Sequence, residues 1–196
     1  MLKREQFETV AQKLGLETAV LQAVAEVESG SRGGFLSDGR VVILFEAHIF
    51  WRRLKLRGID PAPLLTANAD ILSPTWNRTL YRGGRAEWER FEKAAAIDLV
   101  AARESASWGA FQIMGFNYSR CGEGSVGSFV AKMASGEAAQ MELFALFLQN
   151  SGLTASLRTK DWITFAKRYN GSGYAANRYD VRLKDAYDRY SRLCCS

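Results

Sequence analysis

The pattern of apolar and polar positions predicts a chain built mainly from helices. Apolar residues recur every three or four positions over residues 5–14, and Gly15 follows as a typical helix stop. A second such segment, residues 18–28, ends at a stretch rich in glycine and serine, residues 29–34. Further helices are predicted over residues 48–56, 87–103, 126–134, 137–149, 161–169 and 180–193.

Strand propensity is concentrated in one region. Residues 35–36 and 41–45 are apolar and flank the turn-like residues 37–40, which together predict a small β-hairpin. Residues 57–84 contain all three prolines and are predicted to be rich in loops. Because no repeat or linker is evident, we predict a single domain over residues 1–196 of the α+β class, predominantly α-helical with one small hairpin.

Composition and charge narrow the class of protein. The 196 residues are 47% hydrophobic and 24% charged, as in an ordinary globular domain. No apolar run reaches membrane-spanning length, and the first six residues lack the apolar stretch of a secretory signal. We therefore expect synthesis in the cytoplasm of a bacterial host and a separate release route to the cell wall or periplasm.

The net charge of +5 suits a polyanionic partner, although a charge of this size also simply aids solubility. Basic residues are interspersed with acidic ones, so a nucleic-acid partner is not predicted. The basic helix at residues 180–193 could touch an anionic envelope weakly, but its apolar side favours a helix docked on the domain.

Metal and thiol chemistry have little support. Cys121, Cys194 and Cys195 are odd in number, and His48 is the only histidine. No metal-ligand spacing is present, so we predict no metal and no cofactor. The thiols are expected to be reduced, and His48 to be packed or hydrogen-bonded.

Two carboxylates at the end of the second predicted helix differ in their surroundings. At about 100° per residue, Glu28 falls between Leu21 and Val24 at the edge of the apolar face, whereas Glu26 points toward water. Burial penalises the charged form of a carboxyl and raises its pKa. A pKa raised by about two units would keep part of Glu28 protonated near pH 6, as a proton donor requires. The alternative interpretation is that Glu28 only ends the helix and has no catalytic role, because the sequence pattern would be the same in that case.

A second segment combines polar and aromatic side chains with glycines. Within residues 105–115, Ser107 and Gln112 stand among large apolar groups, and an amide there must find a partner. A bound sugar could supply one, and Trp108 or Phe111 could stack on its face. A core helix with a capping serine is the alternative interpretation.

A third segment follows the helix predicted over residues 161–169. Tyr169 and Asn170 come directly before Gly171, and their hydroxyl and amide groups suit sugar binding. An ordinary Asn-Gly helix stop is the alternative.

These segments resemble those of soluble lytic transglycosylases and goose-type lysozymes, and more closely the N-acetylmuramidase domains of phage endolysins. The resemblance extends from about residue 8 to about residue 190. The motifs that carry it, in order, are Glu28-Ser29-Gly30, Leu44-Phe45-Glu46-Ala47-His48, Ser107-Trp108-Gly109-Ala110-Phe111-Gln112-Ile113-Met114-Gly115, Asp161-Trp162 and Tyr169-Asn170-Gly171-Ser172-Gly173-Tyr174.

The resemblance implies a lysozyme-like fold, with the hairpin beside the active-site cleft. It also implies cleavage of the β-1,4 bond between N-acetylmuramic acid and N-acetylglucosamine in bacterial peptidoglycan, with Glu28 as general acid. Many relatives carry a separate wall-binding domain that is not evident in this chain, so its positive surface would have to hold it to the wall. We expect a monomer.

A second carboxylate decides between hydrolysis and a lytic transglycosylase reaction that gives 1,6-anhydro products. Glu46, directly after the apolar strand segment, is the first candidate, followed by Asp38 in the hairpin turn and Glu104. A structural role of Glu46 is equally supported, either in an ion pair with Arg52 or Arg53 or as an acid at a helix start, where the helix dipole favours it. A carboxyl separation of about 6.5–9.5 Å would predict inversion, and about 5–5.5 Å retention. From a different class, a non-catalytic wall-binding module also remains open.

Overall fold

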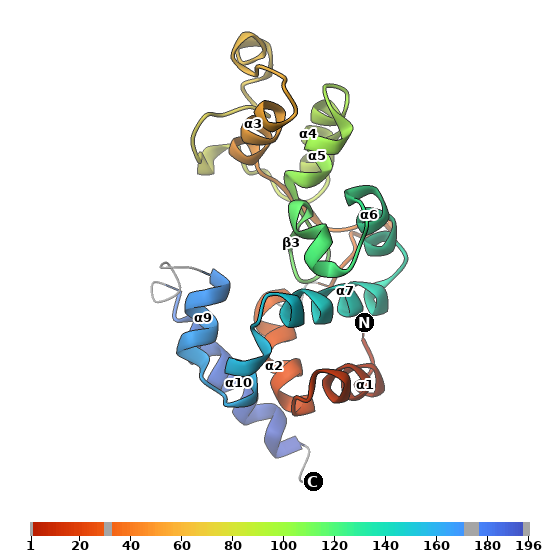
Figure 1. Cartoon of the computed structure of the whole chain (residues 1–196), viewed down its shortest axis with the longest axis vertical. Coiled ribbons are helices and arrows are strands. Elements are labelled where there is room, and N and C mark those ends of the chain that lie inside the picture. The colour runs from red at the N-terminus through yellow and green to blue at the C-terminus, as the bar shows by residue number, and fades with distance from the viewer. Residues whose placement is uncertain (1, 30–32, 171–176, 194–196) are drawn as a thin grey trace.

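The computed structural model describes residues 2–29, 33–170 and 177–193, which are mostly helical (Figure 1). The α-helices are α1 (Arg4–Leu14), α2 (Thr18–Ser29), α3 (Ala47–Leu56), α4 (Arg85–Ala95), α5 (Leu99–Glu104), α6 (Val126–Ala134), α7 (Glu137–Asn150), α8 (Thr154–Arg158), α9 (Trp162–Asn170) and α10 (Tyr179–Leu193). Shorter 3-10 helices are η1 (Ala62–Leu64), η2 (Thr66–Asn68), η3 (Arg78–Leu80) and η4 (Gly115–Cys121). The strands are β1 (Ile43–Phe45), β2 (Ala106–Trp108) and β3 (Ile113–Met114). The predicted helix-dominated α+β class is confirmed.

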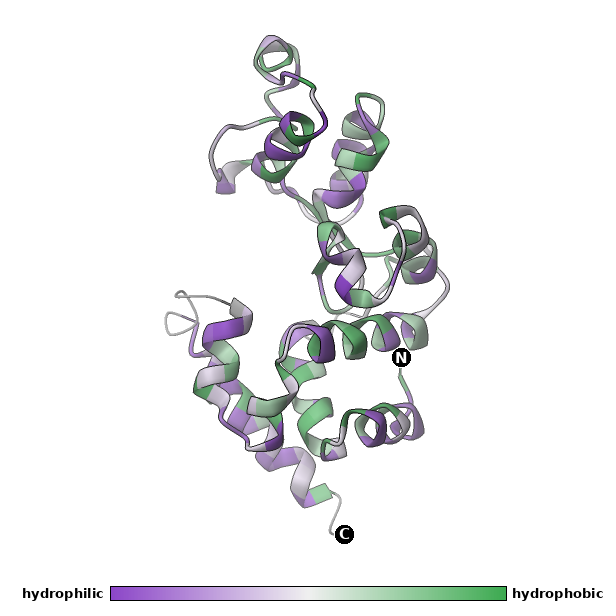
Figure 2. Cartoon of the chain, viewed as in Figure 1, coloured by the Kyte–Doolittle hydropathy of each residue, from purple (hydrophilic) through white to green (hydrophobic). Residues whose placement is uncertain are grey.

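The helices form two groups on either side of the strands (Figure 1). Helices α3, α4 and α5 lie at one end, α1, α2, α9 and α10 lie at the other, and α6 and α7 lie between them. Helix α10 packs along α2, so the prediction of a docked terminal helix is confirmed. Figure 2 shows the strongest apolar colour on the central helices α2 and α7, and mixed colours on the peripheral α1 and α10.

The sheet differs from the predicted hairpin. The hairpin region forms only an isolated bridge between Phe35 and Val41. Strand β1 pairs instead with β2, and β2 with β3, in an antiparallel sheet of order β1-β2-β3. Ser107 lies opposite Leu44 on β1 and opposite Met114 on β3. The segment after residue 105 therefore supplies strands, because its buried side chains pair with an apolar strand distant in sequence.

The single helix predicted over residues 87–103 is two helices. Helix α4 ends at Ala95 and α5 begins at Leu99, with Asp98 as the N-cap between them. The Asp98 carboxylate accepts a hydrogen bond from the Ala101 amide at 2.7 Å. The first amides of a new helix have no acceptor within that helix, and the capping side chain supplies one. The chain can therefore interrupt the helix and turn here.

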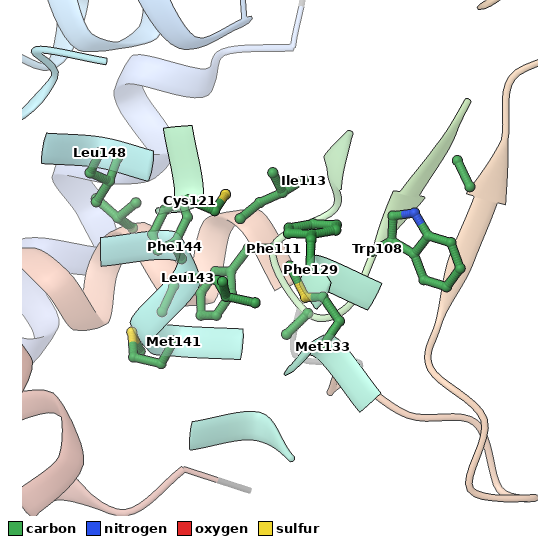
Figure 3. Close-up of a cluster of buried hydrophobic side chains, with 14 of the residues drawn as sticks. Trp108, Phe111, Ile113, Cys121, Phe129, Met133, Met141, Leu143, Phe144 and Leu148 are labelled. Atoms are coloured by element: carbon green, nitrogen blue, oxygen red, sulfur yellow. The ribbon is translucent and has the colours of Figure 1, made fainter. Parts of the chain in front are cut away.

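The core continues through the middle of the molecule (Figure 3). Phe111 stacks on Phe144 of α7 with ring centroids 4.3 Å apart. Beside them the fully buried Gln140 acts as a polar bracket. Its side-chain carbonyl accepts from the Ala110 amide at 2.8 Å, and its amide group donates to the Met133 carbonyl at 2.9 Å. These bonds hold the turn between β2 and β3 to α6 and α7, which fixes the sheet on the helices.

We predict that Gly109→Ala destabilises the protein more than Gly58→Ala. Both glycines have a positive φ, so both variants carry backbone strain of about 1–2 kcal/mol. A Cβ at Gly109 would lie 2.7 Å from the pinned Gln140 side chain, whereas one at Gly58 meets open space. Overpacking adds about 1–3 kcal/mol. Urea denaturation of both variants measures the difference, and equal losses would contradict the bracket role of Gln140.

Candidate active site

The carboxyl group of Glu28 lies in the last turn of α2, at the edge of the core. Val24 and Leu21, one and two turns earlier, are fully buried, as the helical geometry predicts. Glu28 itself keeps some exposed surface, but its Oε1 atom is buried and has no hydrogen-bond partner among the described residues. Desolvation of this kind destabilises the charged form, and it raises the pKa of Glu28 to about 8. The carboxyl is therefore mostly protonated at neutral pH.

Two groups act against this desolvation. The hydrogen-bonding influence of the Tyr169 hydroxyl and the positive charge of Arg182 both lower the pKa of Glu28. Burial and the charge of Glu28 raise the pKa of Tyr169 well above its ordinary value, so this hydroxyl keeps its proton and serves as a donor. The site thus holds a neutral acid and, at the same time, groups that stabilise its anion.

The Tyr169 ring is fixed by aromatic stacking in the last turn of α9. It stacks on Phe165 at 5.4 Å and lies parallel to the ring of Tyr179 at 6.4 Å. The hydroxyl of Tyr179 is buried, and no partner for it lies among the described residues. Because stacked rings leave little rotational freedom, the Tyr169 hydroxyl keeps a defined position relative to Glu28.

Arg182 connects α10 to the end of α2. Its Nη2 donates to the Val27 carbonyl at 3.4 Å, one of the carbonyls that a helix end leaves without an intrahelical partner. Nearby, the prediction that Glu26 points into water is wrong: its carboxylate pairs with Arg189 and accepts a hydrogen bond from the Tyr190 hydroxyl at 2.9 Å. Helix α10 covers that side of α2, which the pattern of α2 alone could not reveal.

Glu46 belongs to a second cluster, at the junction of β1 and α3. Its Oε2 accepts a hydrogen bond of 2.5 Å from the Tyr81 hydroxyl and lies 3.2 Å from Nδ1 of His48. Trp76 Nε1 donates to the same Tyr81 hydroxyl at 2.8 Å. The alternative of an ion pair with Arg52 or Arg53 does not occur. The His48 side chain is largely buried, in line with the prediction of a packed residue, and burial lowers its pKa.

A buried ion pair supports this second cluster. Glu87 is fully buried and bonds Arg90 Nη1 at 2.8 Å. One oxygen of Glu87 accepts from the backbone amide of Phe45, directly before Glu46, at 3.0 Å. The other accepts from the amides of Arg82 and Gly83, directly after Tyr81, at 2.6 and 3.0 Å. A single carboxylate therefore holds both segments that carry the Glu46–Tyr81 contact.

The other two candidate carboxylates are paired with arginines. Asp38 is 2.9 Å from Arg40 and 3.2 Å from Arg85, and these contacts lower its pKa. Glu104 lies 3.6 Å from Arg53. Arginine-paired carboxylates on a surface commonly have a structural role, so Glu46 stays the first candidate for a second functional carboxylate.

The residues expected to contact sugar are only partly available. Trp108 is fully buried and donates through its indole N–H to the Arg103 carbonyl at 3.0 Å, so its predicted stacking on a sugar is replaced by a core role. Phe111 is buried likewise. Ser107 donates to the Gln112 side-chain oxygen at 2.8 Å, and the Gln112 amide group donates to a backbone carbonyl within the same turn. The polar partners that we expected from a sugar are largely supplied by the protein.

Some predicted residues lie outside the described part, and other groups were missed. The side chain of Asn170 and all of residues 171–176 fall outside it, as do Cys194 and Cys195. The roles of Trp76, Tyr81 and Arg182 were not predicted. Two aromatic residues in a loop rich in proline and glycine were the available signal for the first two; Arg182 looked like any other cation of a basic helix.

Metal and thiol chemistry gain no support from the described residues. Within them, no group of three histidine, cysteine, aspartate or glutamate side chains is placed to hold a metal ion. Cys121 is a buried free thiol, and burial raises its pKa to about 12. A thiol with so high a pKa is a poor nucleophile.

Comparisons with known proteins indicate the family of the chain. The family model described as N-acetylmuramidase matches residues 17–191. The crystal structure of the endolysin of Burkholderia phage AP3 is 41% identical and superposes with a TM-score of 0.89. The match covers 97% of this chain and 72% of that one. No curated protein matches the chain.

We predict that Glu28→Gln becomes more stable than the wild type as the pH rises. The folded pKa of about 8 exceeds the ordinary value of 4.5, so the folded state binds more protons between these values and loses stability as the pH increases. One pKa unit corresponds to about 1.4 kcal/mol; because the side chain is partly exposed, we expect a gain on the order of 3 kcal/mol at pH 9. Urea unfolding at pH 5 and pH 9 measures it.

Glu26→Gln, which removes a carboxylate two residues away on the same helix, is the matched control. A constant stability difference between Glu28→Gln and wild type would contradict the raised pKa.

We predict that Arg182→Gln raises the pKa of Glu28 above that of the wild type. The charge of Arg182 lowers the pKa of Glu28, so without it the rise caused by desolvation is larger. Carbon-13 NMR titration of the carboxyl group measures the pKa directly. Arg192→Gln, ten residues further along the same helix and about 15 Å away along its axis, is the control. An unchanged pKa in Arg182→Gln would remove this arginine from the site.

Proposed function

The chain belongs to the N-acetylmuramidase family, and from this premise we propose that it hydrolyses the β-1,4 bond between N-acetylmuramic acid and N-acetylglucosamine in bacterial peptidoglycan, with Glu28 as general acid. The observation that carries the proposal is the desolvated carboxyl at the end of α2, whose pKa of about 8 keeps it protonated at neutral pH. A glycosidic oxygen is a poor leaving group until it receives a proton, and this carboxyl can supply one.

The surroundings of Glu28 suit both halves of the proton transfer. Before transfer, desolvation favours the neutral acid. After transfer, the Tyr169 hydroxyl and the charge of Arg182 stabilise the carboxylate that forms. We assign Tyr169 and Arg182 as positioning groups for the acid. Ser107 and Gln112 support the turn between β2 and β3 and could offer remaining hydrogen-bonding capacity to a sugar.

Glu46 is the proposed second carboxylate, which would act as a general base on water. Among the three candidates it is the one that contacts a tyrosine and a histidine and has no arginine partner in the described structure. A general base must be free of a permanent cation to accept a proton readily.

One observation favours the lytic transglycosylase reaction as a second candidate. The groups that shift the pKa of Glu28 are Tyr169 and Arg182, and no second carboxylate is among them. If a water-activating base does not reach the reacting sugar, the 6-hydroxyl of the muramic acid attacks instead and a 1,6-anhydro product forms.

We further propose that the protein reaches the wall after release from a bacterial cytoplasm and acts as a monomer. None of the described helices is long and apolar enough to cross a membrane. The net charge of +5 supports weak attraction to anionic envelope polymers.

We predict that Glu28→Gln abolishes release of soluble fragments from purified peptidoglycan. Loss of a general acid typically costs 10²–10⁴-fold in rate, so a drop of about 10³-fold is expected with binding to the insoluble wall unchanged. Glu26→Gln should retain activity. Mass spectrometry of the wild-type products distinguishes reducing muramic ends from anhydro ends. Undiminished release by Glu28→Gln would remove this residue from its role.

The same product analysis tests Glu46. Glu46→Gln keeps an acceptor for Tyr81 but cannot take a proton, so it should lose the products with reducing ends. Full hydrolysis by this variant would show that Glu46 is not the base.

A further inference from the structure

Trp76 is unusually exposed for a residue that is tied into a hydrogen-bond network. It is 60% exposed, and the other large exposed hydrophobic residues of the described structure are aliphatic. Those others are Leu56, Leu99, Ile163 and Leu193. Exposing the apolar surface of a tryptophan to water is unfavourable, and a bound ligand would cover it. This position is therefore a candidate for ligand binding.

The indole ring of Trp76 is held in place through its polar edge. Its N–H donates to the Tyr81 hydroxyl, which in turn donates to Glu46. The rings of Trp76 and Tyr81 lie 6.5 Å apart at 55°. Because the N–H already has a partner inside the protein, the network leaves the apolar face of the indole as the part that can meet a ligand.

The loop around Trp76 is anchored on both sides. Before it, the Ser73 hydroxyl donates to the Thr75 carbonyl at 2.6 Å. After it, the Asn77 side chain accepts from the Thr79 amide at 3.0 Å and so begins η3. Further along, the buried Glu87 holds the backbone after Tyr81, as described above. A ring on an anchored loop loses little conformational entropy when it binds, which favours a preorganised platform.

The chemistry of this platform fits a carbohydrate. A flat apolar face can pack against the C–H face of a pyranose ring, and a polar rim can bond its hydroxyl and acetamido groups. Asn77, Arg78 and Thr79 are all exposed directly beside Trp76 and supply such a rim. The hydrogen-bond network that begins at Trp76 ends at Glu46, the carboxylate proposed above to act on the substrate. A glycan strand with one sugar on Trp76 would therefore extend toward Glu46.

We propose that Trp76 is a substrate-binding residue that stacks on a sugar ring of the glycan strand, on the side of the site that holds Glu46. This inference rests on the proposed function. Tyr81 and Glu46 act here as positioning residues for the indole ring, in addition to any role of Glu46 on water.

The test combines binding and kinetics. Binding is measured by calorimetry with a soluble N-acetylglucosamine hexamer, using variants made in the inactive Glu28→Gln background. Kinetics are measured with purified peptidoglycan in the active background. Trp76→Ala should weaken binding at least tenfold and raise KM by a similar factor with kcat changed less than threefold. Trp76→Phe keeps an aromatic face but loses the N–H that bonds Tyr81, so its affinity and KM should lie between those of Trp76→Ala and the parent. Leu56→Ala, which removes a similarly exposed side chain, should change neither.

Two outcomes would overturn the inference. Trp76→Ala could bind the hexamer and the wall as tightly as its parent, or it could lower kcat with KM unchanged, which would mean that Trp76 serves only to hold Glu46. Circular dichroism and urea unfolding confirm that the variants are folded.

Failure of the proposed function would look different. If the active protein released no fragments from peptidoglycan while hexamer binding still depended on Trp76, the platform would stand and the reaction would be wrong. If Trp76→Ala released fragments with an unchanged KM, the proposed hydrolysis would be supported, whereas the proposed sugar binding by Trp76 would be contradicted.

Discussion

The carboxyl group of Glu28 sits where water cannot fully stabilise its charge, and the site is organised around this constraint. Helix α2 brings the group to the edge of the core, and α9 and α10 supply the tyrosine and the arginine that lower its pKa. Helix α2 must pack correctly against α9 and α10, which lie far from it in the sequence, to give the Glu28 carboxyl this environment. Helix α10 packs along α2, so the environment of Glu28 depends on the C-terminal part of the chain.

The two candidate clusters of the site lie on separate elements. The Glu28 cluster belongs to α2, α9 and α10, and the Glu46 cluster belongs to β1, α3 and the loop before α4 (Figure 1). The short sheet and the Gln140 bracket lie between them and connect both to α6 and α7. Residues such as Gln112 and Trp108, which the motifs suggested for substrate contact, instead build this connecting region. Trp108 is buried in this region, and the Gln112 side chain bonds Ser107 and the Gly109 carbonyl within the protein.

Local patterns predicted what depends on local physics. The helix periodicity gave α2 and α10 nearly to the residue, and the position of Glu28 at the edge of an apolar face followed from helix geometry alone. The strand pairing was missed because the partner of β1 is about sixty residues away, and no local signal marks it. The environment of Glu26 and the roles of Tyr81 and Arg182 were missed for the same reason: each depends on which distant element packs against it.

The Glu87 carboxylate, shared between the end of β1 and the loop after Tyr81, has a consequence for how the protein opens. Releasing either segment alone would leave a buried anion short of donors, at a cost of about 1–3 kcal/mol for each bond lost. The two segments should therefore detach together and exchange their amide hydrogens as a single cooperative unit, slowly and with equal protection. A loop that looks peripheral would then behave dynamically as part of the sheet.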